Sequence, residues 1–447
     1  MTDSSALLPS AQAITSDLNY ALKPSAVRSR SYRASILPTN KATFAPSDTC
    51  IIYVPGGRRN SYLDVGQTYM RFTVKNTDAT NAFRMDGNAS SVINRIDIFH
   101  GSNLLETIQG YNILVNYILD MQASQSQRAG LANIYGFDTA GDRQGVSISA
   151  GAQQTFCMPI FSGVVGVLAD KCLPIGMLAD DIRLEITFET SALGVVATAG
   201  TPVYSVVDFQ LELCIIELSD EGEGMVRQVA NPDEPIYLHG SSWRHYTSNL
   251  ASGTSGGYST LVPARFASLK QLALCPRRSS DQIATSYAIA SRVNPNIEYY
   301  WWRIGSSVIP SKAVYLANTN NTGGYAEGYA ELLKSWHALH TVANSSALGG
   351  ANTEYNRADI AIANTPVLAG ATAGSGTYAN GFVIAQELES FAQRNDVLLC
   401  GMNTLSSQVF FECNIASTGP SVAYTLDFYA WYDHILVLER GLLSVKF

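Results

Sequence analysis

The feature that most limits the possible folds is a pattern that occurs twice along the chain. An Asp-Phe pair followed by a long apolar run begins at Asp208 ("DFQLELCIIELS") and returns 219 residues later at Asp427 ("DFYAWYDHILVLE"). From position 208 to 215 apolar and polar residues alternate strictly, which is the period of a strand with one buried face. The repetition predicts two related β units.

Three further pairs of short motifs keep the same order in both copies. They are a Gly-Ser turn between strands at Gly101 and Gly305, a Gly-Tyr pair opening a helical pattern at Gly110 and Gly328, and a Gly-Met pair at Gly176 and Gly401. The offsets lie between 204 and 225 residues. Solenoid and propeller units are only about 20 to 50 residues long. Four collinear pairs at this spacing therefore indicate a duplicated domain.

The strand and helix signals within each copy indicate the kind of domain. From Cys50 onward, short β-type segments are separated by clusters of Gly, Asn, Asp and Ser. Strong helical spacing occurs in two places only, from Tyr111 to Met121 and from Tyr325 to Leu339. About eight short strands with one embedded helix are typical of a jelly roll. We predict an all-β fold of two tandem eight-stranded jelly rolls, with a few short helices in the loops.

Changes in composition divide the chain into four parts. Residues 1–47 are rich in Ser, Ala and Pro with weak periodicity, and residues 221–235 are polar and contain Gly and Pro. The predicted division is an N-terminal arm over 1–47, a first jelly roll over 48–220, a linker over 221–235 and a second jelly roll over 236–447. The longest irregular regions, about 122–153 and 341–381, are expected to project from one end of each sandwich.

The net charge of the chain argues against a protein whose whole surface binds nucleic acid. The chain is 46% hydrophobic and only 15% charged, with a formal net charge of −8. The single basic focus is Arg28, Arg30 and Arg33 in the arm. Two interpretations stand equally: an arm that contacts a genome or an inner lattice, and a solvated flexible tail.

The cysteines and the N-terminal residues bear on the compartment. The seven cysteines contain no CxxC pair and mostly lie in apolar runs, which predicts reduced core residues in a protein assembled inside a cell. The first ten residues, "MTDSSALLPS", lack the basic and apolar regions of a signal peptide, and no run of 18 apolar residues occurs. The sequence thus predicts neither secretion nor a membrane span.

A search for catalytic or ligand-binding patterns favours a structural protein. The six histidines form no HxH or HExxH pattern, and His337 with His340 is interpreted as a polar helix surface because no acidic or cysteine partner is near in sequence. The acid pairs Asp180-Asp181 and Glu387 with Glu389 are interpreted as solvated. We therefore predict no enzyme, no catalytic residue, no cofactor, no metal site and no small-molecule substrate.

Two aromatic features are interpreted as packing or contact surfaces. The run Tyr299 to Trp302, read as a strand, places two rings on each face, which fits a core plus an inter-domain or inter-subunit face. The chain ends in apolar "GLLSVKF", so the end is expected to be tied into a sheet or against a neighbour. Phe447 is the candidate residue for a C-terminal subunit contact.

Four segments carry a resemblance to a known family. They are "YLDVGQTYMRFTV" (62–74), "LPIGMLADDIRLEITF" (173–188), "VPARFASLKQL" (262–272) and the terminal "YDHILVLERGLLSVKF" (432–447). In this order the chain, from about residue 48 to its end, resembles a double jelly-roll major capsid protein of a small eukaryotic DNA virus. Virophages, Polinton-like viruses and the adenovirus-hexon lineage are the relatives in question.

The resemblance implies a function and a set of partners. It implies a homotrimer whose six jelly rolls form a hexon-like, pseudo-hexagonal capsomer in an icosahedral virion capsid, assembled inside the host cell in cytoplasm or nucleus. The implied partners are further copies of the chain, minor capsid and penton proteins, and a genome or inner layer through the arm. The chain is shorter than many relatives, which implies modest outer projections.

Two other classes of protein are alternatives to the capsid interpretation. A non-enzymatic carbohydrate-binding double β-sandwich protein is the alternative. Such a protein is expected to have a secretion signal and a cleft with convergent carboxylates, and the sequence indicates neither. A single jelly-roll capsid protein with a protruding domain predicts no internal repeat, and the four collinear motif pairs oppose it.

Overall fold

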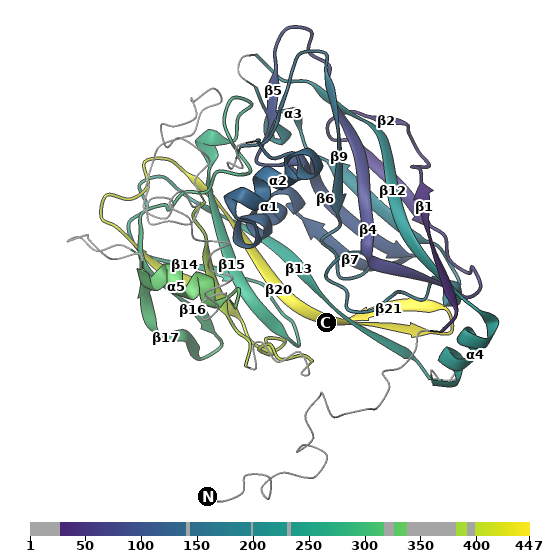
Figure 1. Ribbon diagram of the computed structural model, residues 1–447. Helices are drawn as coiled ribbons and strands as arrows, with labels where there is room; N and C mark the ends of the chain where they lie inside the picture. Colours follow the sequence, from purple (N-terminus) through teal and green to yellow (C-terminus); the bar gives the residue numbers. More distant parts are fainter. Residues whose placement is uncertain are drawn as a thin grey trace, which may run out of the picture.

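Two β-sandwiches lie side by side in the computed structural model, which describes residues 27–139, 144–197, 200–229, 234–316, 326–337, 381–390 and 398–447 (Figure 1). Each sandwich consists of a larger and a smaller antiparallel sheet. Among the described residues no helix is both long and apolar enough to cross a membrane.

The first sandwich is built from the N-terminal half of the chain. One sheet has the spatial order β1 (Ser29–Ile36), β12 (Tyr204–Leu218), β4 (Ser61–Asn76) and β9 (Gln153–Pro159), with β2 (Thr43–Phe44) also paired to β12. The facing sheet has the order β3 (Thr49–Val54), β10 (Ile182–Phe188), β6 (Ile93–His100) and β7 (Asn103–Gln109). A small third sheet contains β11 (Val195–Ala197), β5 (Phe83–Met85) and β8 (Ser147–Ile148).

The second sandwich repeats this arrangement. Its larger sheet has the order β13 (Ile236–Leu250), β20 (Tyr424–Glu439), β15 (Leu269–Arg278) and β18 (Ile384–Glu387), with β21 (Leu442–Lys446) paired to β20. Its facing sheet has the order β14 (Gly256–Val262), β19 (Val409–Ile415), β16 (Ile297–Ile304) and β17 (Ser307–Tyr315).

The connectivity of the two sandwiches is identical. Counting the eight principal strands of each in chain order, one sheet has the order 1-8-3-6 and the other 2-7-4-5, which is the jelly-roll topology. The predicted fold class is therefore confirmed. Three of the four motif pairs take equivalent places, for example Gly101 and Gly305, which turn the hairpins β6–β7 and β16–β17 with positive φ of 57° and 60°. In the fourth pair, Gly110 caps the start of α1 whereas Gly328 lies inside α5.

Helices occupy the connections between strands. The predicted helices are confirmed as α1 (Tyr111–Gln122) and, for the described residues, α5 (Ala326–Lys334), each between the fifth and sixth strands of its jelly roll. The remaining helices are α2 (Gln125–Tyr135), α3 (Ser191–Gly194), α4 (Asp220–Val229) and the short 3-10 turns η3 (Ala89–Val92), η4 (Ile175–Met177) and η5 (Ser279–Asp281).

Three stretches differ from the sequence expectation. Strand β1 lies inside the predicted arm, where its eight residues pair with β12. Its polar, largely exposed residues give no strand signal of their own, so the sequence does not predict this pairing. Helix α4 occupies most of the predicted linker. Helix α2 begins within the predicted irregular region 122–153, where Ser124 and Gln127 form a capping box. Residues 1–26 of the arm and 341–380 of the second irregular region lie outside the described residues.

Alternation along the strands fills the two cores. In β12, Phe209, Leu211, Leu213 and Ile215 are buried, as the alternation predicted. In β16, Tyr300 and Trp302 are buried in the second core while Tyr299 and Trp301 are half-buried on the other face. This confirms the expected split of the aromatic run between two faces.

Candidate functional site

Helix α1 forms the centre of the junction between the two jelly rolls (Figure 1). Every residue from Tyr111 to Met121 is buried, including the polar residues Asn112, Asn116 and Asp120. A surface helix normally exposes its polar face, so complete burial means that α1 is covered on all sides.

Buried hydrogen bonds cross this junction. The Asp86 carboxylate accepts the backbone N–H groups of Ile289 at 2.8 Å and Ala290 at 2.9 Å from the second jelly roll. Burial raises the pKa of Asp86 to about 6, outweighing these two bonds. The Tyr429 hydroxyl donates to the Gly110 carbonyl at 2.9 Å, at the start of α1. These directional bonds specify one relative placement of the sandwiches.

An aromatic cluster lies beside α1. Trp243 stacks on Trp431 at a ring separation of 5.4 Å and on Trp336 at 6.3 Å. The Tyr117 hydroxyl of α1 accepts hydrogen bonds from Trp336 Nε1 and Gln271 Nε2, both at 2.7 Å. The three tryptophans also line a cavity of about 280 Å³. The junction thus combines aromatic packing with hydrogen bonds to the Tyr117 hydroxyl.

A row of alternating acidic and basic side chains crosses the larger sheet of the second jelly roll. It joins side chains from neighbouring strands and reaches Asp170 of the first jelly roll at one end and the end of α5 at the other. In order, its members are Asp170, His239, Asp433, Lys270, Glu389, His337 and Glu387, and we call this set the charge row. The pKa of His239 is raised, chiefly by Asp433 at 3.3 Å.

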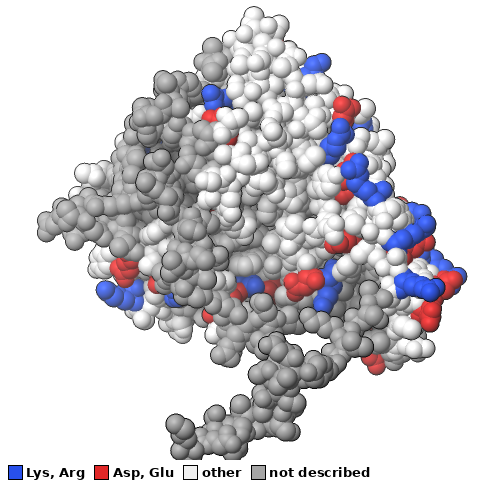
Figure 2. Space-filling model, in the orientation of Figure 1, with Lys and Arg blue, Asp and Glu red and all other residues white. Residues whose placement is uncertain are grey.

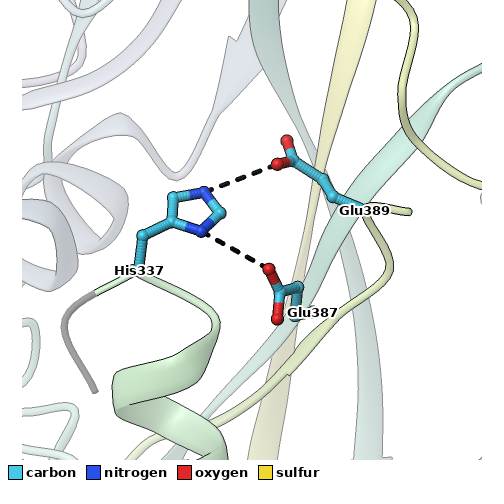
Figure 3. A group of neighbouring side chains, drawn as sticks. All are labelled: His337, Glu387 and Glu389. Atoms are coloured by element: carbon cyan, nitrogen blue, oxygen red, sulfur yellow. Dashed lines mark ion pairs between the residues drawn. The ribbon is translucent and has the colours of Figure 1, made fainter. Parts of the chain in front are cut away.

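His337, Glu387 and Glu389 end the charge row (Figure 3). His337 Nδ1 lies 3.4 Å from Glu387 Oε1, and His337 Nε2 lies 3.4 Å from Glu389 Oε2. The Glu387 and Glu389 side chains are only 10% and 5% exposed, and that of His337 is 27% exposed. The three residues come from the end of α5, the end of β18 and the turn after it.

These positions correct two interpretations made from the sequence. Glu387 and Glu389 are not solvated, because the fold buries them against His337 and Lys270. His337 does have acidic partners, fifty residues away in sequence at positions 387 and 389, a separation at which no local spacing rule applies. His340 lies outside the described residues. Asp180 and Asp181 are exposed, as predicted.

The predicted basic focus lies at the edge strand β1. Arg30 forms an ion pair with Glu217 at 2.8 Å, and Arg33 with Glu212 at 3.0 Å, both across the β1–β12 ladder. Arg28 is exposed just before β1. A genome or inner-lattice contact by these arginines stays a prediction.

The C-terminal residues are held by their own chain. Strand β21 extends the larger sheet, and the Leu443 N–H donates to His100 Nδ1 of the first jelly roll at 3.1 Å. The Phe447 ring packs near Phe266 and Tyr432 and is 50% exposed. The expected attachment to a sheet is confirmed, and a subunit contact of Phe447 stays a prediction.

The cysteines are all free thiols, and most are at least partly buried. None of the seven cysteines forms a disulfide bond, and Cys50, Cys275 and Cys413 are buried as predicted. Cys172 differs from that prediction, because it is exposed.

Charged groups are unevenly distributed over the described surface. Figure 2 shows them gathered toward the edge that carries β1, β12 and α4, while much of the central described face has few. Exposed pairs such as Arg59 with Asp220 at 3.3 Å belong to the charged edge.

Comparison with known proteins places the fold. No model of a known protein family matches the sequence, and no curated protein does. Solved structures do match over nearly the whole chain. The quasi-atomic model of the PBCV-1 virus capsid has a TM-score of 0.62 at 9% identity, covering 96% of this chain and 99% of that chain.

Two further viruses provide similar structures. The faustovirus major capsid protein has a TM-score of 0.55 at 8% identity, covering 97% of this chain and 94% of its own. The 3.5 Å cryo-EM structure of the Sputnik virophage contains a chain with a TM-score of 0.50 at 11% identity, covering 97% and 92%. Both jelly rolls take part in these matches, so the chain has the double jelly-roll fold of viral major capsid proteins.

Proposed function

We propose that this chain is the structural major capsid protein of a DNA virus, forming homotrimeric, hexon-like capsomers that tile an icosahedral capsid. The observation that carries the proposal is the fusion of two jelly rolls of identical topology across one buried junction. Three such chains around an axis present six similar sandwiches, which gives a threefold particle a nearly hexagonal outline. Its location is then the virion, after assembly inside the host cell.

The junction supplies the rigidity that this role requires. A pseudo-hexagonal outline persists only if the angle between the two sandwiches of each chain is constant. Complete burial of α1 and the bonds of Asp86 and Tyr429 oppose a change of that angle, because any rotation would break buried hydrogen bonds. The same features describe a structural role and require no catalysis.

Exposed apolar side chains are candidates for contacts between copies. Val308 and Tyr315 lie on the edge strand β17, and Leu398 and Leu405 lie in the segment that precedes β19, all between 41% and 59% exposed. Phe447 is half-exposed at the C-terminal strand. Apolar and aromatic residues with few charges are typical of subunit interfaces.

Partners beyond the chain itself follow from the same proposal. A closed shell needs minor capsid and penton proteins where trimers meet or fivefold positions occur. Arg28, Arg30 and Arg33, with the residues that precede them, would contact a genome or inner layer. No small-molecule substrate is part of this role.

The mass in solution tests the proposal most directly. Light scattering on the purified full-length chain should give about three times 48.2 kDa, and negative-stain images should show particles of pseudo-hexagonal outline or closed shells. A monodisperse monomer that forms no lattice at high concentration would contradict it.

A further inference from the structure

We propose that His337, Glu387 and Glu389 bind one divalent transition-metal cation of the zinc class. This inference goes beyond the capsid function and does not depend on it. The three side chains offer one imidazole nitrogen and carboxylate oxygens, and these ligand atoms all lie within 4.8 Å of one another. One nitrogen with two carboxylates is a donor set that zinc accepts in proteins.

The distances between the groups, which form ion pairs in this structure, are compatible with coordination of a cation. Both nitrogen–oxygen distances are 3.4 Å, longer than the roughly 2.7 to 2.9 Å of a charge-assisted hydrogen bond. Zinc bonds of about 2.0 to 2.1 Å at tetrahedral angles place two ligand atoms about 3.4 Å apart. Each nitrogen–oxygen pair taken singly therefore has the spacing of two ligands on one ion, although the two pairs involve different nitrogens of the ring.

One adjustment is required for binding. An imidazole gives a metal a single nitrogen, whereas the two carboxylates face opposite ring nitrogens of His337 (Figure 3). Rotation about the side-chain bonds of one glutamate brings its oxygen to the other ring edge. Because the His337 side chain is 27% exposed, a cation can enter from solvent and water can fill the remaining position.

The charge balance of the charge row also calls for a cation. Four of its members are acidic, Asp170, Asp433, Glu387 and Glu389, while Lys270 is its single lysine. The charge row therefore has an excess of acidic groups over lysine, and the side chains of Asp433, Glu387 and Glu389 are at most 10% exposed. A divalent cation at His337 compensates part of that excess.

Lys270 has a compatible position in this arrangement. Its ammonium lies 2.9 Å from Glu389 Oε1, whereas Glu389 Oε2 faces His337. The two oxygens of one carboxylate can thus serve lysine and metal separately. The ion pair with Lys270 would fix the orientation of the Glu389 carboxylate, as residues around metal ligands commonly do.

The donor set predicts selectivity among cations. Mg²⁺ and Ca²⁺ take six or more oxygen ligands, and two carboxylates with one nitrogen serve them poorly. Zn²⁺ and Co²⁺ accept imidazole with carboxylate at low coordination number. We expect Zn²⁺ to bind at least 100-fold more tightly than Mg²⁺.

Binding at this place would connect two segments that are distant in sequence. His337 follows α5, and Glu387 ends β18, the sixth strand of the second jelly roll. A cation bound to both segments binds the folded chain and not the unfolded one, so it stabilises the folded state by mass action. Zinc should therefore raise the melting temperature in a saturable manner.

Calorimetric titration of ZnCl₂ into the purified, tag-free chain tests the proposal. The background carries Cys172→Ser, because the exposed thiol is a competing zinc ligand. We expect one zinc per chain, and at least a tenfold loss of affinity in His337→Asn and in Glu387→Gln. The matched control is His239→Asn, which changes a histidine between Asp170 and Asp433 in the same charge row and should alter affinity less than threefold.

A spectroscopic measurement separates ligation from altered folding. Co²⁺ should give a visible absorption band in the parent chain and in His239→Asn, and lose it in His337→Asn, while circular dichroism of all three stays unchanged. Equal zinc affinity in the parent and His337→Asn would overturn the proposal, as would an equal loss in His239→Asn. A chain that forms trimers but binds no zinc would refute this site and leave the capsid function intact.

Discussion

The two jelly rolls share one strand order but use the same helix position in opposite ways. In the first, α1 is buried along its length and becomes the junction. In the second, α5 is partly exposed, and His337 lies in the turn that follows it, next to Glu387. Duplication preserved the strands because their alternation builds each core, whereas the connecting helices were free to acquire different contacts.

The paired aspartates show the same divergence at single residues. Asp427 of β20 is buried and contacts Arg277 Nε at 2.7 Å and His245 Nε2 at 2.8 Å. Asp208 of β12 is exposed with a positive φ of 51°, where the register with β4 shifts. One position of the duplicated motif thus became an internal ion pair and the other a surface bulge.

The largest effect on stability is expected from a test of the difference between Asp427 and Asp208. Asp427→Asn should destabilise the chain by about 3 to 5 kcal/mol, because it leaves the buried Arg277 uncompensated. Asp208→Asn should change stability by less than about 0.5 kcal/mol, since asparagine tolerates positive φ at an exposed site. Urea unfolding followed by circular dichroism measures both. Similar losses in the two variants would contradict the comparison.

Truncation of one leucine in each helix tests the different burial of α1 and α5. Leu114→Ala should cost about 2 to 5 kcal/mol, because Leu114 is fully buried and its truncation leaves a cavity in the core. Leu333→Ala should cost about 1 kcal/mol, because Leu333 is only partly buried. Urea midpoints of the two variants give the comparison. A larger loss in Leu333→Ala would reverse the roles assigned to the helices.

The stability of the chain should fall as pH rises, because the pKa of Asp86 in the junction is raised. Its pKa is raised from 3.8 to about 6, so its contribution to stability is present below pH 3.8 and is lost as pH rises through 6. Across pH 4 to 7 this amounts to about 3 kcal/mol at most. The stability of the parent minus that of Asp86→Asn should fall over this range. A difference that is constant with pH would show that Asp86 does not titrate there.

The smallest stability effect is expected at the charged edge. Arg30→Ala should leave the urea midpoint almost unchanged, because the Arg30 side chain is 72% exposed and its pair with Glu217 is screened by solvent. The triple replacement of Arg28, Arg30 and Arg33 by alanine should nevertheless weaken DNA binding and reduce its salt dependence, measured by fluorescence anisotropy. Unchanged DNA binding would contradict the proposed genome contact of these arginines.

Much of the fold could be predicted because its signals are local. Alternation identified the buried face of β12, the helical spacing identified α1 and α5, and the collinear motif pairs identified two copies of one domain. Strand β1 could not be predicted, since its polar residues become a strand only through pairing with β12, more than 170 residues away in the chain.

The sequence identified the members of the cluster but not their contact. His337 and the pair Glu387 with Glu389 stand out as candidate ligands, but local spacing rules treat them as separate surface groups. Their contact depends on where α5 ends relative to β18, and on the pairing of β18 with β15 that brings Lys270 alongside.

By itself, then, the amino-acid sequence determined the strand faces, the duplication and the jelly-roll class, because these follow from a period of two and from order along the chain. Tertiary structure alone decided that α1 would be buried between the sandwiches, that Asp427 would pair internally, and that His337 would meet two carboxylates. The physical reason is that burial and charge pairing depend on which surfaces meet across a sheet or a junction, and separation in sequence does not encode that meeting.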